Sequence, residues 1–341
     1  MQENDAVQEP STVDTAGSEH TARAHSNIAL IKYWGKRDAT LNLPAVGSIS
    51  VTLDALTTDT TVRFTQDGAA DELWLDGERV AAGRAGRMLD LVRERAGIRA
   101  SATVTSTNNF PTGAGLASSA SGFAALAVAA CAAAGLEATP TELSILARRG
   151  SGSAARSIFG GVVELHAGEA ADGNDAFAEP ILDAADWPLS VVVAITSREA
   201  KSVSSTAGMG RSAASSPFYP AWTDTADQDL ADMRAAIAAR DFARVGELAE
   251  YSCLKLHALM MTTRPALIYW NAATVAAIHT VMELRASGIP VYFTIDAGPQ
   301  VKALCAPADA PAVASALAAV VGVHETRTSG LGRGAHLVPQ P

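Results

Sequence analysis

The spacing of apolar and polar residues in the first half of the chain predicts strands mixed with helices. Residues 28–31 form an apolar strand, and residues 48–53 alternate apolar and polar positions as a half-buried strand does. Residues 73–80 fold around Asp76-Gly77, a dipeptide typical of tight hairpins. Further strands are expected at 60–64, 102–105 and 162–166, with helices at 84–96, after the glycine-rich stretch that begins at 110, and from 140 to 150.

The start of one helix is marked by its capping residues. Thr139 is suited to the N-cap, Pro140 to the first helical position, and Glu142 closes a capping box. In the second half, strands are expected at 190–196 and 291–295, and helices at 227–240, 244–261, 273–287 and 311–321. This mixed order of strands and helices predicts the α+β class.

Composition divides the chain into a tail and two domains. Residues 1–21 are acidic, lack Lys and Arg, and predict a disordered tail. The remaining length suits two domains, and loop-like composition at 171–188 predicts limits of 22–185 and 186–338. The longest apolar run, 123–135, is too short to cross a bilayer, so no membrane span is expected.

The net charge of −10 argues against a nucleic-acid-binding surface, so an anionic ligand would need a local basic pocket. Cys131, Cys253 and Cys305 have no C-x-x-C spacing, which favours reduced thiols and a cytoplasmic location. The histidines show no metal-ligand spacing and are interpreted as structural or surface residues; they are His25, His166, His257, His279 and His336.

Lys32 ends an apolar strand and is followed by Tyr33, Trp34, Gly35 and Lys36. A buried ammonium without a partner loses its hydration at a cost of several kcal/mol. Lys32 therefore predicts an anionic partner, either a protein carboxylate or a substrate.

Three further segments have the chemistry of an anion site. Residues 111–119 form a glycine-rich loop before a helix, which fits either a phosphate cradle or a plain tight turn. Residues 151–156 combine two hydroxyls with Arg156, which suits an anion receptor or a capped helix start with a surface arginine. Asp296 follows a strand and precedes Gly298-Pro299, a placement that fits a catalytic carboxylate or an Asx-type turn.

Taken together, these segments resemble the diphosphomevalonate decarboxylases, which belong to the superfamily of galactokinase, homoserine kinase, mevalonate kinase and phosphomevalonate kinase. The resemblance runs from about Ala22 to Leu337. Its motifs are NIALIKYWGKRD (27–38), NNFPTGAGLASSASG (108–122), RRGSGSAARSIFGG (148–161), VSSTAGM (203–209) and YFTIDAGPQ (292–300).

The resemblance implies a ribosomal-protein-S5-like N-terminal domain, a ferredoxin-like C-terminal domain and an active site in the cleft between them. It implies ATP- and magnesium-dependent conversion of (R)-5-diphosphomevalonate to isopentenyl diphosphate in the mevalonate pathway, with phosphorylation of the 3-hydroxyl first. Members of the family are usually homodimers.

The resemblance also assigns roles to residues. Asp296 would orient or deprotonate the 3-hydroxyl, Lys32 would lie beside it, and Arg156 would hold the C1 carboxylate. Substrate contacts would come from Tyr33, Trp34, Gly35, Lys36, Arg84, Ser151, Gly152, Ser153, Ala154, Ala155, Arg156 and Thr206. ATP contacts would come from Ser106, Asn108, Pro111, Gly113, Ala114, Gly115, Leu116, Ala117, Ser118, Ser119 and Ser205. Magnesium would arrive with ATP, and Ser119 is the candidate side-chain contact.

Two departures from the family pattern and three alternatives remain open. Val46 and Gly47 stand where many members carry Asn-Ser, and Thr206 stands where some bacterial members carry Arg. The alternatives are a mevalonate 3-kinase, a decarboxylase of the monophosphate, and a non-catalytic nucleotide-binding protein. Retention of Asp296 and Lys32 favours decarboxylation.

Overall fold

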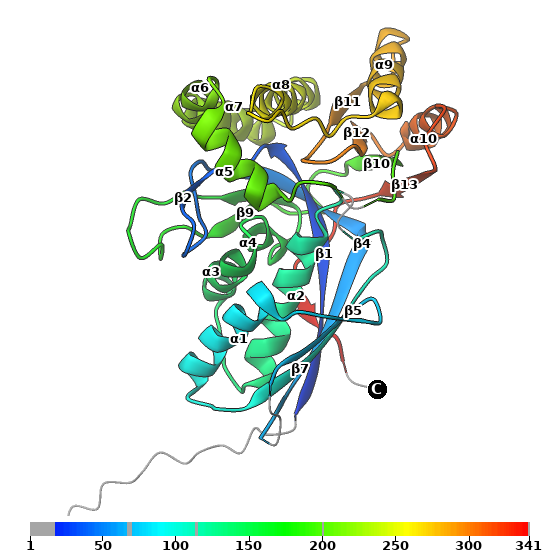
Figure 1. The fold of residues 1–341 in the computed structure, drawn as a ribbon. Helices are drawn as coiled ribbons and strands as arrows, with labels where there is room; N and C mark the ends of the chain where they lie inside the picture. The colour runs from blue at the N-terminus through cyan, green and yellow to red at the C-terminus, as the bar shows by residue number, and fades with distance from the viewer. Residues whose placement is uncertain (1–17, 67–69, 113–114, 200, 340–341) are drawn as a thin grey trace, which may run out of the picture.

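The computed structural model describes residues 18–66, 70–112, 115–199 and 201–339. Most of the expected tail, residues 1–17, and two expected ATP contacts, Gly113 and Ala114, therefore lie outside the described residues. The described part is of the α+β class, as predicted, with a large N-terminal sheet and a smaller C-terminal one (Figure 1).

The first sheet has the strand order β14-β1-β4-β7-β5-β6, and β8 pairs with β4 and with β9. Helices α1 to α4 lie against one face of this sheet (Figure 1). The strands are β1 (Glu19–Ile31), β4 (Ser48–Thr65), β5 (Glu72–Leu75), β6 (Glu78–Val80), β7 (Ser101–Asn108), β8 (Val162–Leu165), β9 (Ala178–Leu182) and β14 (His336–Leu337). The helices are α1 (Gly83–Ala96), α2 (Ser118–Ala133), α3 (Pro140–Gly150) and the single turn α4 (Ala154–Ser157).

The second sheet is antiparallel, with the order β11-β12-β10-β13. Its strands are β10 (Ser190–Ile195), β11 (Val291–Thr294), β12 (Val301–Cys305) and β13 (Glu325–Ser329). The helices of this half are α5 (Ser205–Ser215), α6 (Tyr219–Asp224), α7 (Ala226–Ala238), α8 (Phe242–Met261), α9 (Ala272–Ala286) and α10 (Ala310–Ala318). A short ribbon of β2 (Lys36–Asp38) and β3 (Leu43–Pro44) follows β1. Among the described helices, none combines the length and apolarity that a bilayer crossing requires.

Several predicted elements are confirmed, whereas two boundaries and one burial pattern were wrong. The capping box of α3 is present, with Thr139 accepting from the Glu142 backbone while the Glu142 side chain accepts in return. The tail was extended too far, because β1 already begins at Glu19, which pairs with Arg63. Residues 48–53 and 60–64 belong to one strand, and residues 48–53 are buried throughout rather than alternating.

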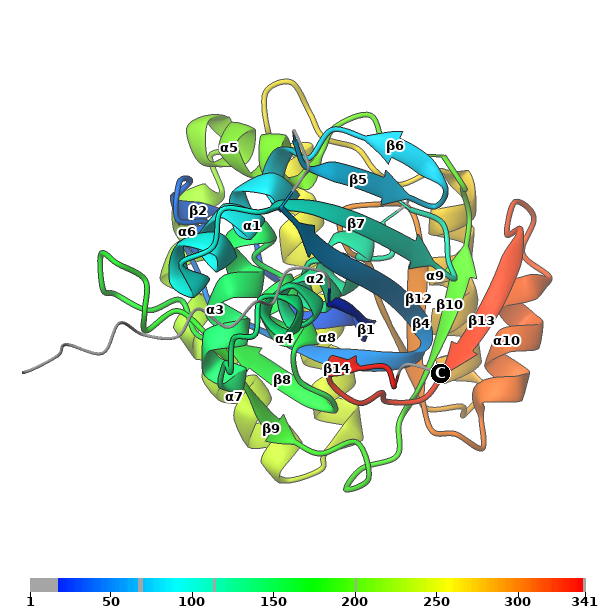
Figure 2. The ribbon, with the colours of Figure 1, turned by 90° about the horizontal axis from the view of Figure 1, so that it is seen from below.

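The domain limits of 22–185 and 186–338 stay a prediction, and the end of the chain adds a detail to them. His336 pairs with Arg23 in β1, so the last strand belongs to the N-terminal sheet (Figure 2). Leu331 also bridges to Leu53. The C-terminal segment therefore returns to the first sheet after β13.

One apolar cluster joins the two halves and fixes where β1 ends. Ile28 and Leu30 of β1 share it with Val193 of β10 and with Val245 and Leu248 of α8. Because this shared core holds β1 against the C-terminal half, the residue after the strand, Lys32, lies beside the turn that follows β11. The fold thus brings residues from both halves to one place.

Candidate active site

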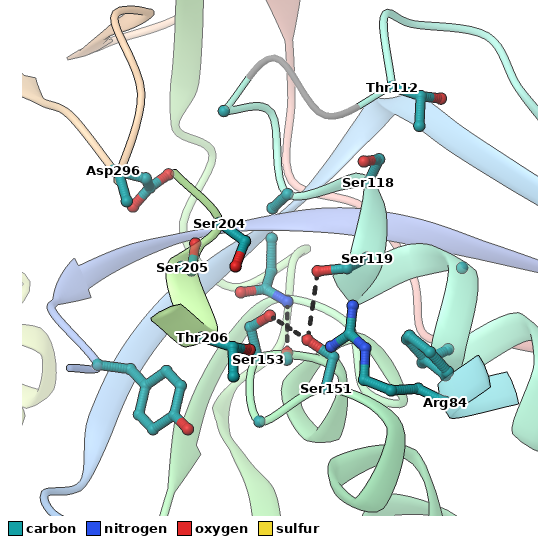
Figure 3. Close-up of a pocket in the computed structure, with 18 of the residues that line it drawn as sticks. Arg84, Thr112, Ser118, Ser119, Ser151, Ser153, Ser204, Ser205, Thr206 and Asp296 are labelled. Carbon is teal, nitrogen blue, oxygen red and sulfur yellow. Dashed lines mark hydrogen bonds between the residues drawn. The ribbon is translucent and has the colours of Figure 1, made fainter. Parts of the chain in front are cut away.

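A cavity of about 600 Å³ lies where the two halves meet. Its polar lining comes from β1, the start of α2, the turn at α4 and the start of α5 (Figure 3). Figure 3 shows the hydroxyls of Ser118, Ser119, Ser151 and Ser205 gathered around one space, with Asp296 at its edge. The segments singled out in the sequence therefore face a common cavity.

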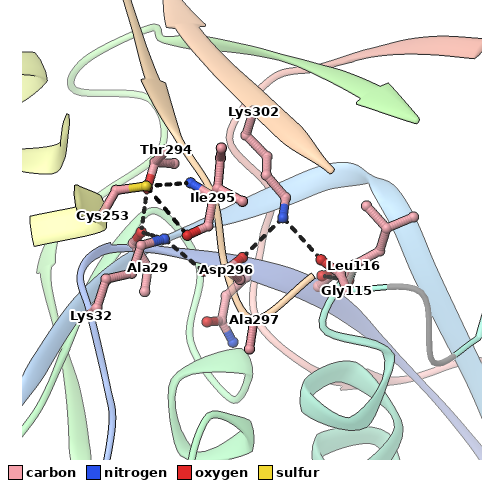
Figure 4. A network of polar contacts seen from close by, with 12 residues as sticks. Ala29, Lys32, Gly115, Leu116, Cys253, Thr294, Ile295, Asp296, Ala297 and Lys302 are labelled. Atoms are coloured by element: carbon pink, nitrogen blue, oxygen red, sulfur yellow. Dashed lines mark hydrogen bonds and ion pairs between the residues drawn. The ribbon is translucent and has the colours of Figure 1, made fainter. Parts of the chain in front are cut away.

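The predicted partner of Lys32 is Asp296. Lys32 Nζ donates to Asp296 Oδ1 at 2.7 Å and to the Ala29 carbonyl at 2.8 Å (Figure 4). Lys32 is 2% exposed. This contact places a carboxylate on the cavity wall, at the end of a strand from the other half of the chain.

A second ammonium, which the sequence reasoning missed, lies on the other oxygen of the same carboxylate. Lys302 Nζ is 3.2 Å from Asp296 Oδ2 and donates to the Gly115 carbonyl at 2.9 Å (Figure 4). Within the described residues, Asp296 Oδ2 has no aligned hydrogen-bond donor, so it keeps an accepting lone pair. Although burial opposes ionisation, Lys32 and Lys302 together hold the pKa of Asp296 well below its usual range.

Arg156 is a buried cation on the same cavity, with neutral partners. Its Nε donates to Ser50 Oγ at 2.8 Å, its Nη2 donates to Asn27 Oδ1 at 3.1 Å, and Nη1 contacts Ser48 Oγ. Burial lowers the pKa of Arg156 to about 10, and Asp296 opposes that shift. Because its partners are uncharged, the guanidinium keeps a full positive charge available to an anion in the cavity.

The start of α2 supplies a phosphate-type environment. Ala117 takes a left-handed conformation at the N-cap and its side chain makes no capping hydrogen bond. Gly115 has φ +83°, and a Cβ there would lie 2.9 Å from the Gly298 Cα. The loop can therefore approach the Asp296 turn only as glycine, and it leaves the positive end of α2 facing the cavity.

The hydroxyl residues of the α4 turn complete this wall. Ser119 Oγ lies 3.2 Å from Ser151 Oγ, which lies 3.3 Å from Ser153 Oγ. Asn27 Nδ2 donates to the Ser153 carbonyl at 2.9 Å and fixes that turn. Since these hydroxyls bond mainly to each other, they can exchange those contacts for phosphate oxygens.

Tyr33 lies against the α4 turn. A Cβ on Gly152 would lie 2.5 Å from the Tyr33 hydroxyl oxygen, so only glycine allows this packing. Within the described residues the buried Tyr33 hydroxyl has no hydrogen-bond partner. Burial raises the pKa of Tyr33, so its hydroxyl stays neutral beside the cavity that the residue lines. Trp34, Lys36 and Thr206 also line this part.

The other end of the cavity is largely apolar. Its lining includes Leu73, Leu75, Val104, Phe123 and Leu126, from β5, β7 and α2. The guanidinium of Arg84 lies 5.1 Å from the centre of the Phe123 ring and donates to the Gly150 carbonyl at 2.9 Å. Ser106 and Asn108 line the same end, which fits a flat aromatic base with a few polar contacts.

Lys201 is another cavity residue that the sequence reasoning missed. Its Nζ donates to Ser205 Oγ at 2.7 Å and to the Ala297 carbonyl at 3.0 Å. Burial lowers the pKa of Lys201 to about 8. Its position just before the hydroxyl-rich segment at 202–206 is the signal that could have identified it.

Five of the expected site residues lie outside the cavity lining, and four of them have a packing role instead. Ala154 and Ala155 are fully buried in the core, and Leu116 belongs to the shared apolar cluster. Gly35 has φ +100°, and a Cβ there would lie 2.3 Å from the Tyr219 hydroxyl. Pro111 does not line the cavity either. Val46 and Gly47, the departures from the family pattern, pack against α5–α8 residues and are also absent from the lining.

Two family models match the chain, one to each half. The diphosphomevalonate decarboxylase-like N-terminal domain matches residues 24–178, and the mevalonate 5-diphosphate decarboxylase C-terminal domain matches residues 191–336. The chain belongs to the diphosphomevalonate decarboxylase family. The family resemblance predicted from the motifs is thereby confirmed, and its two-domain α+β fold agrees with the structure.

Individual members of the diphosphomevalonate decarboxylase family show the same similarity. The Homo sapiens enzyme is 39% identical over 302 residues, which is 82% of this chain and 74% of the human one. The solved structure from Enterococcus faecalis is 39% identical, with a TM-score of 0.86 over 94% of this chain and 99% of that chain. The Staphylococcus aureus structure is 38% identical, with a TM-score of 0.88 over 94% and 98%.

A further related structure is described as a complex with MVAPP, AMPPCP and magnesium. It is 40% identical to this chain, with a TM-score of 0.88, and the match covers 94% of this chain and 99% of that chain. The residues that would hold magnesium here are few, because the described residues contain no cluster of three His, Cys, Asp or Glu side chains. The hydroxyl groups at the start of α2 and the surrounding cations fit a magnesium ion that is carried by nucleotide phosphates.

Proposed function

We propose that Asp296, Lys32 and Arg156 carry the chemistry of the reaction that this chain catalyses, the ATP-dependent decarboxylation of (R)-5-diphosphomevalonate to isopentenyl diphosphate. ADP, phosphate and carbon dioxide are the other products. The observation that supports this assignment most directly is the Lys32–Asp296 ion pair on the wall of a cavity that also holds Arg156.

Asp296 orients the tertiary 3-hydroxyl toward the γ-phosphate of ATP. Its side chain lines the cavity and is 23% exposed, so the carboxylate can accept from that hydroxyl. Because two lysines hold the pKa of Asp296 well below its usual range, the carboxylate remains ionised and acts first as a hydrogen-bond acceptor. Lys32 balances its charge and lies near the phosphoryl group in transfer, where positioning and charge dominate catalysis.

Arg156 holds the C1 carboxylate, and the Tyr33 region holds the diphosphate. After phosphorylation, the C3–O bond to phosphate breaks and the C1–C2 bonding electrons form the C2–C3 double bond as carbon dioxide leaves. Arg156 keeps its charge on the carboxylate oxygens, away from the carbocation character that develops at C3. The diphosphate meets Tyr33, Lys36 and the hydroxyls of Ser151 and Ser153, which line one wall.

ATP occupies the remaining length of the cavity. Its phosphates lie on the N-terminus of α2, near Ser118, Ser119 and Ser205, and its base lies on the apolar end. Ser119 is the side chain that would contact a magnesium ion carried by these phosphates, and the ion would supply neutralisation of their charge.

The decisive test is incubation of the protein with ATP, magnesium and diphosphomevalonate, followed by detection of isopentenyl diphosphate. Parallel reactions with mevalonate and with its monophosphate, monitored by ADP release, distinguish the sister activities. A higher kcat/KM for the monophosphate would overturn the substrate assignment. ADP release without loss of carbon dioxide would instead indicate a kinase.

The working form of the enzyme is a homodimer in the cytoplasm. Support for the dimer comes from the family, and the buried state of Cys131, Cys253 and Cys305 fits a reducing compartment. Sedimentation equilibrium of the purified chain, whose mass is 35.1 kDa, tests the dimer. A concentration-independent mass of a single chain would contradict it.

A further inference from the structure

Lys302 is a buried charged residue in a strand whose other residues are apolar. β12 has the sequence VKALC, and its apolar residues Val301, Ala303 and Cys305 belong to one hydrophobic cluster. Lys302 itself is 0% exposed and does not line the cavity. An apolar side chain at this position of β12 would pack in the core without the free-energy cost of desolvating a charge. Packing alone therefore does not explain why a lysine stands here.

The two contacts of Lys302 connect segments that the proposed mechanism uses separately. Its Nζ is 3.2 Å from Asp296 Oδ2 and donates to the Gly115 carbonyl at 2.9 Å. Gly115 lies in the loop before α2 and packs closely against Gly298. A Cβ on Gly115 would lie 2.9 Å from the Gly298 Cα. The ammonium thus joins the carboxylate to the loop at the point where the two turns touch (Figure 4).

Lys302 is not needed to neutralise Asp296, because Lys32 already does so at 2.7 Å. The second cation makes the cluster net positive, and burial lowers the pKa of Lys302 against the opposing pull of Asp296. A geometric function explains this arrangement better than charge balance does. One oxygen of the carboxylate accepts from Lys32, directly after β1, and the other forms an ion pair with Lys302 of β12.

We propose that Lys302 is a positioning residue that holds the Asp296 carboxylate in register with the phosphate-binding loop before α2. The Asp296 carboxylate, which accepts from the 3-hydroxyl, and the loop that binds the γ-phosphate are thereby kept at a fixed distance from each other. The inference rests on the proposed function, in which Asp296 orients that hydroxyl. A displacement of about 1 Å between such groups costs on the order of 100-fold in rate.

The charged and titratable groups that face Asp296 come from five parts of the chain. They are Lys32 directly after β1, Lys302 of β12, Arg156 of α4, Lys201 of the loop before α5, and Cys253 and His257 of α8. Removal of Lys302 takes away one of the two nearest cations. The acid limb of kcat, which reports protonation of Asp296, should then move to higher pH.

The experiment compares Lys302→Met with Lys255→Met in the full chain. Lys255 is an α8 lysine that pairs with Asp229, away from the cavity, and serves as the matched control. For Lys302→Met we expect kcat to fall about 10- to 100-fold, KM for ATP and for diphosphomevalonate to change much less, and the acid limb to shift upward. Lys255→Met should leave all three unchanged.

An unchanged kcat together with an unmoved acid limb in a folded Lys302→Met protein would overturn the proposal. If that protein fails to fold, Lys302→Gln supplies the same readouts, because the amide can still donate to the Gly115 carbonyl but lacks the charge. Asp296→Asn separates this inference from the proposed function. Full turnover by Asp296→Asn would refute the role of Asp296, whereas an inactive Asp296→Asn beside an unimpaired Lys302→Met would refute the role of Lys302 alone.

Discussion

Lys32 donates to Asp296 at 2.7 Å although the two residues are 264 positions apart in the sequence. The strand before Lys32 is packed against α8, and the Ser252 hydroxyl of that helix accepts from the Lys32 backbone N–H at 3.0 Å. The strand before Asp296 pairs within the other sheet. The ion pair therefore forms only when the two halves of the fold pack together, and it lies on the wall of the cavity between them.

Replacement of Asp296 by Asn should nearly abolish turnover while ATP and substrate still bind. The amide fills the same space, but it cannot balance the charge of Lys32 or accept a hydrogen bond from a hydroxyl as strongly as a carboxylate does. Loss of positioned acid–base help of this kind costs on the order of 10²- to 10⁴-fold. Rates of ADP release and calorimetric titration with ATP measure the two effects. Asp309→Asn is the control, since that side chain caps no helix N–H group.

Replacement of Arg156 by Lys should raise KM for diphosphomevalonate and lower kcat/KM. The guanidinium is held by Ser50, Ser48 and Asn27, and a lysine cannot make this fork or grip a carboxylate with two parallel bonds. Complete loss of one partner in a buried charge pair costs about 2–5 kcal/mol, and the loss here should be smaller because lysine keeps the charge. Steady-state kinetics with Arg244→Lys, an exposed change, provide the comparison. Equal kcat/KM in both variants would exclude a carboxylate contact.

Part of this site could be predicted from the sequence, and the rest could not. Lys32 could be recognised because an ammonium at the end of an apolar strand needs a partner, and the structure supplies Asp296. The same reasoning applies to Lys302 within VKALC, but the strand β12 was not predicted and the residue was missed. Gly35 and Ala155 were included because they lie inside matching motifs, yet a motif does not distinguish residues that touch ligand from those that pack beneath them.

Long-range pairing explains the errors in the elements. Separate strands were predicted at 48–53 and 60–64, but Asp59 pairs with Arg23 across the sheet and one strand continues through both. The extension of β1 to Glu19 depends on Arg63, far along the chain. Local periodicity contains no information about such partners.

Replacement of Gly152 by Ala should weaken binding of the substrate diphosphate with little change in ATP binding. The new methyl group would lie 2.5 Å from the Tyr33 hydroxyl oxygen, so the ring must move from its place on the α4 turn. We expect KM for diphosphomevalonate to rise at least about tenfold, which corresponds to about 1.4 kcal/mol. Gly210→Ala is the matched control, because nothing lies within 4 Å of its added Cβ. If both variants keep the same KM, Tyr33 is not a diphosphate contact.

Binding of ATP above pH 8 should be accompanied by proton uptake at Lys201. Burial lowers the pKa of Lys201 to about 8, so the free protein loses this cation as the pH rises through that value. Phosphate oxygens near Ser205 favour the ammonium and raise its pKa again when ATP binds. Affinity for ATP should therefore fall as the pH rises above 8.

Calorimetric titrations at pH 8.5 in buffers of different ionisation enthalpy measure this uptake directly. The observed enthalpy should depend on the buffer for the unmodified chain, and the dependence should disappear in Lys201→Met. Lys255→Met should retain it. An enthalpy independent of the buffer in the unmodified chain would rule out a titrating lysine at the phosphate site.

His257 should make the fold sensitive to acid. Its ring is 1% exposed beneath the Asp296 turn, and Trp270 Nε1 donates to its Nε2 at 3.2 Å. Burial, with help from Lys32, lowers the pKa of His257 to about 3 from an ordinary value of 6.5. Between those values the unfolded chain binds one more proton than the folded chain, so the free energy of unfolding falls as the pH falls, by at most about 1.4 kcal/mol per pH unit. In His257→Gln this proton is absent, and Tm should decline less steeply between pH 6.5 and pH 4. His279→Gln, an exposed change on α9, is the control and should show the same decline of Tm with falling pH as the unmodified chain. If Tm of His257→Gln declines just as steeply, His257 does not set the acid sensitivity.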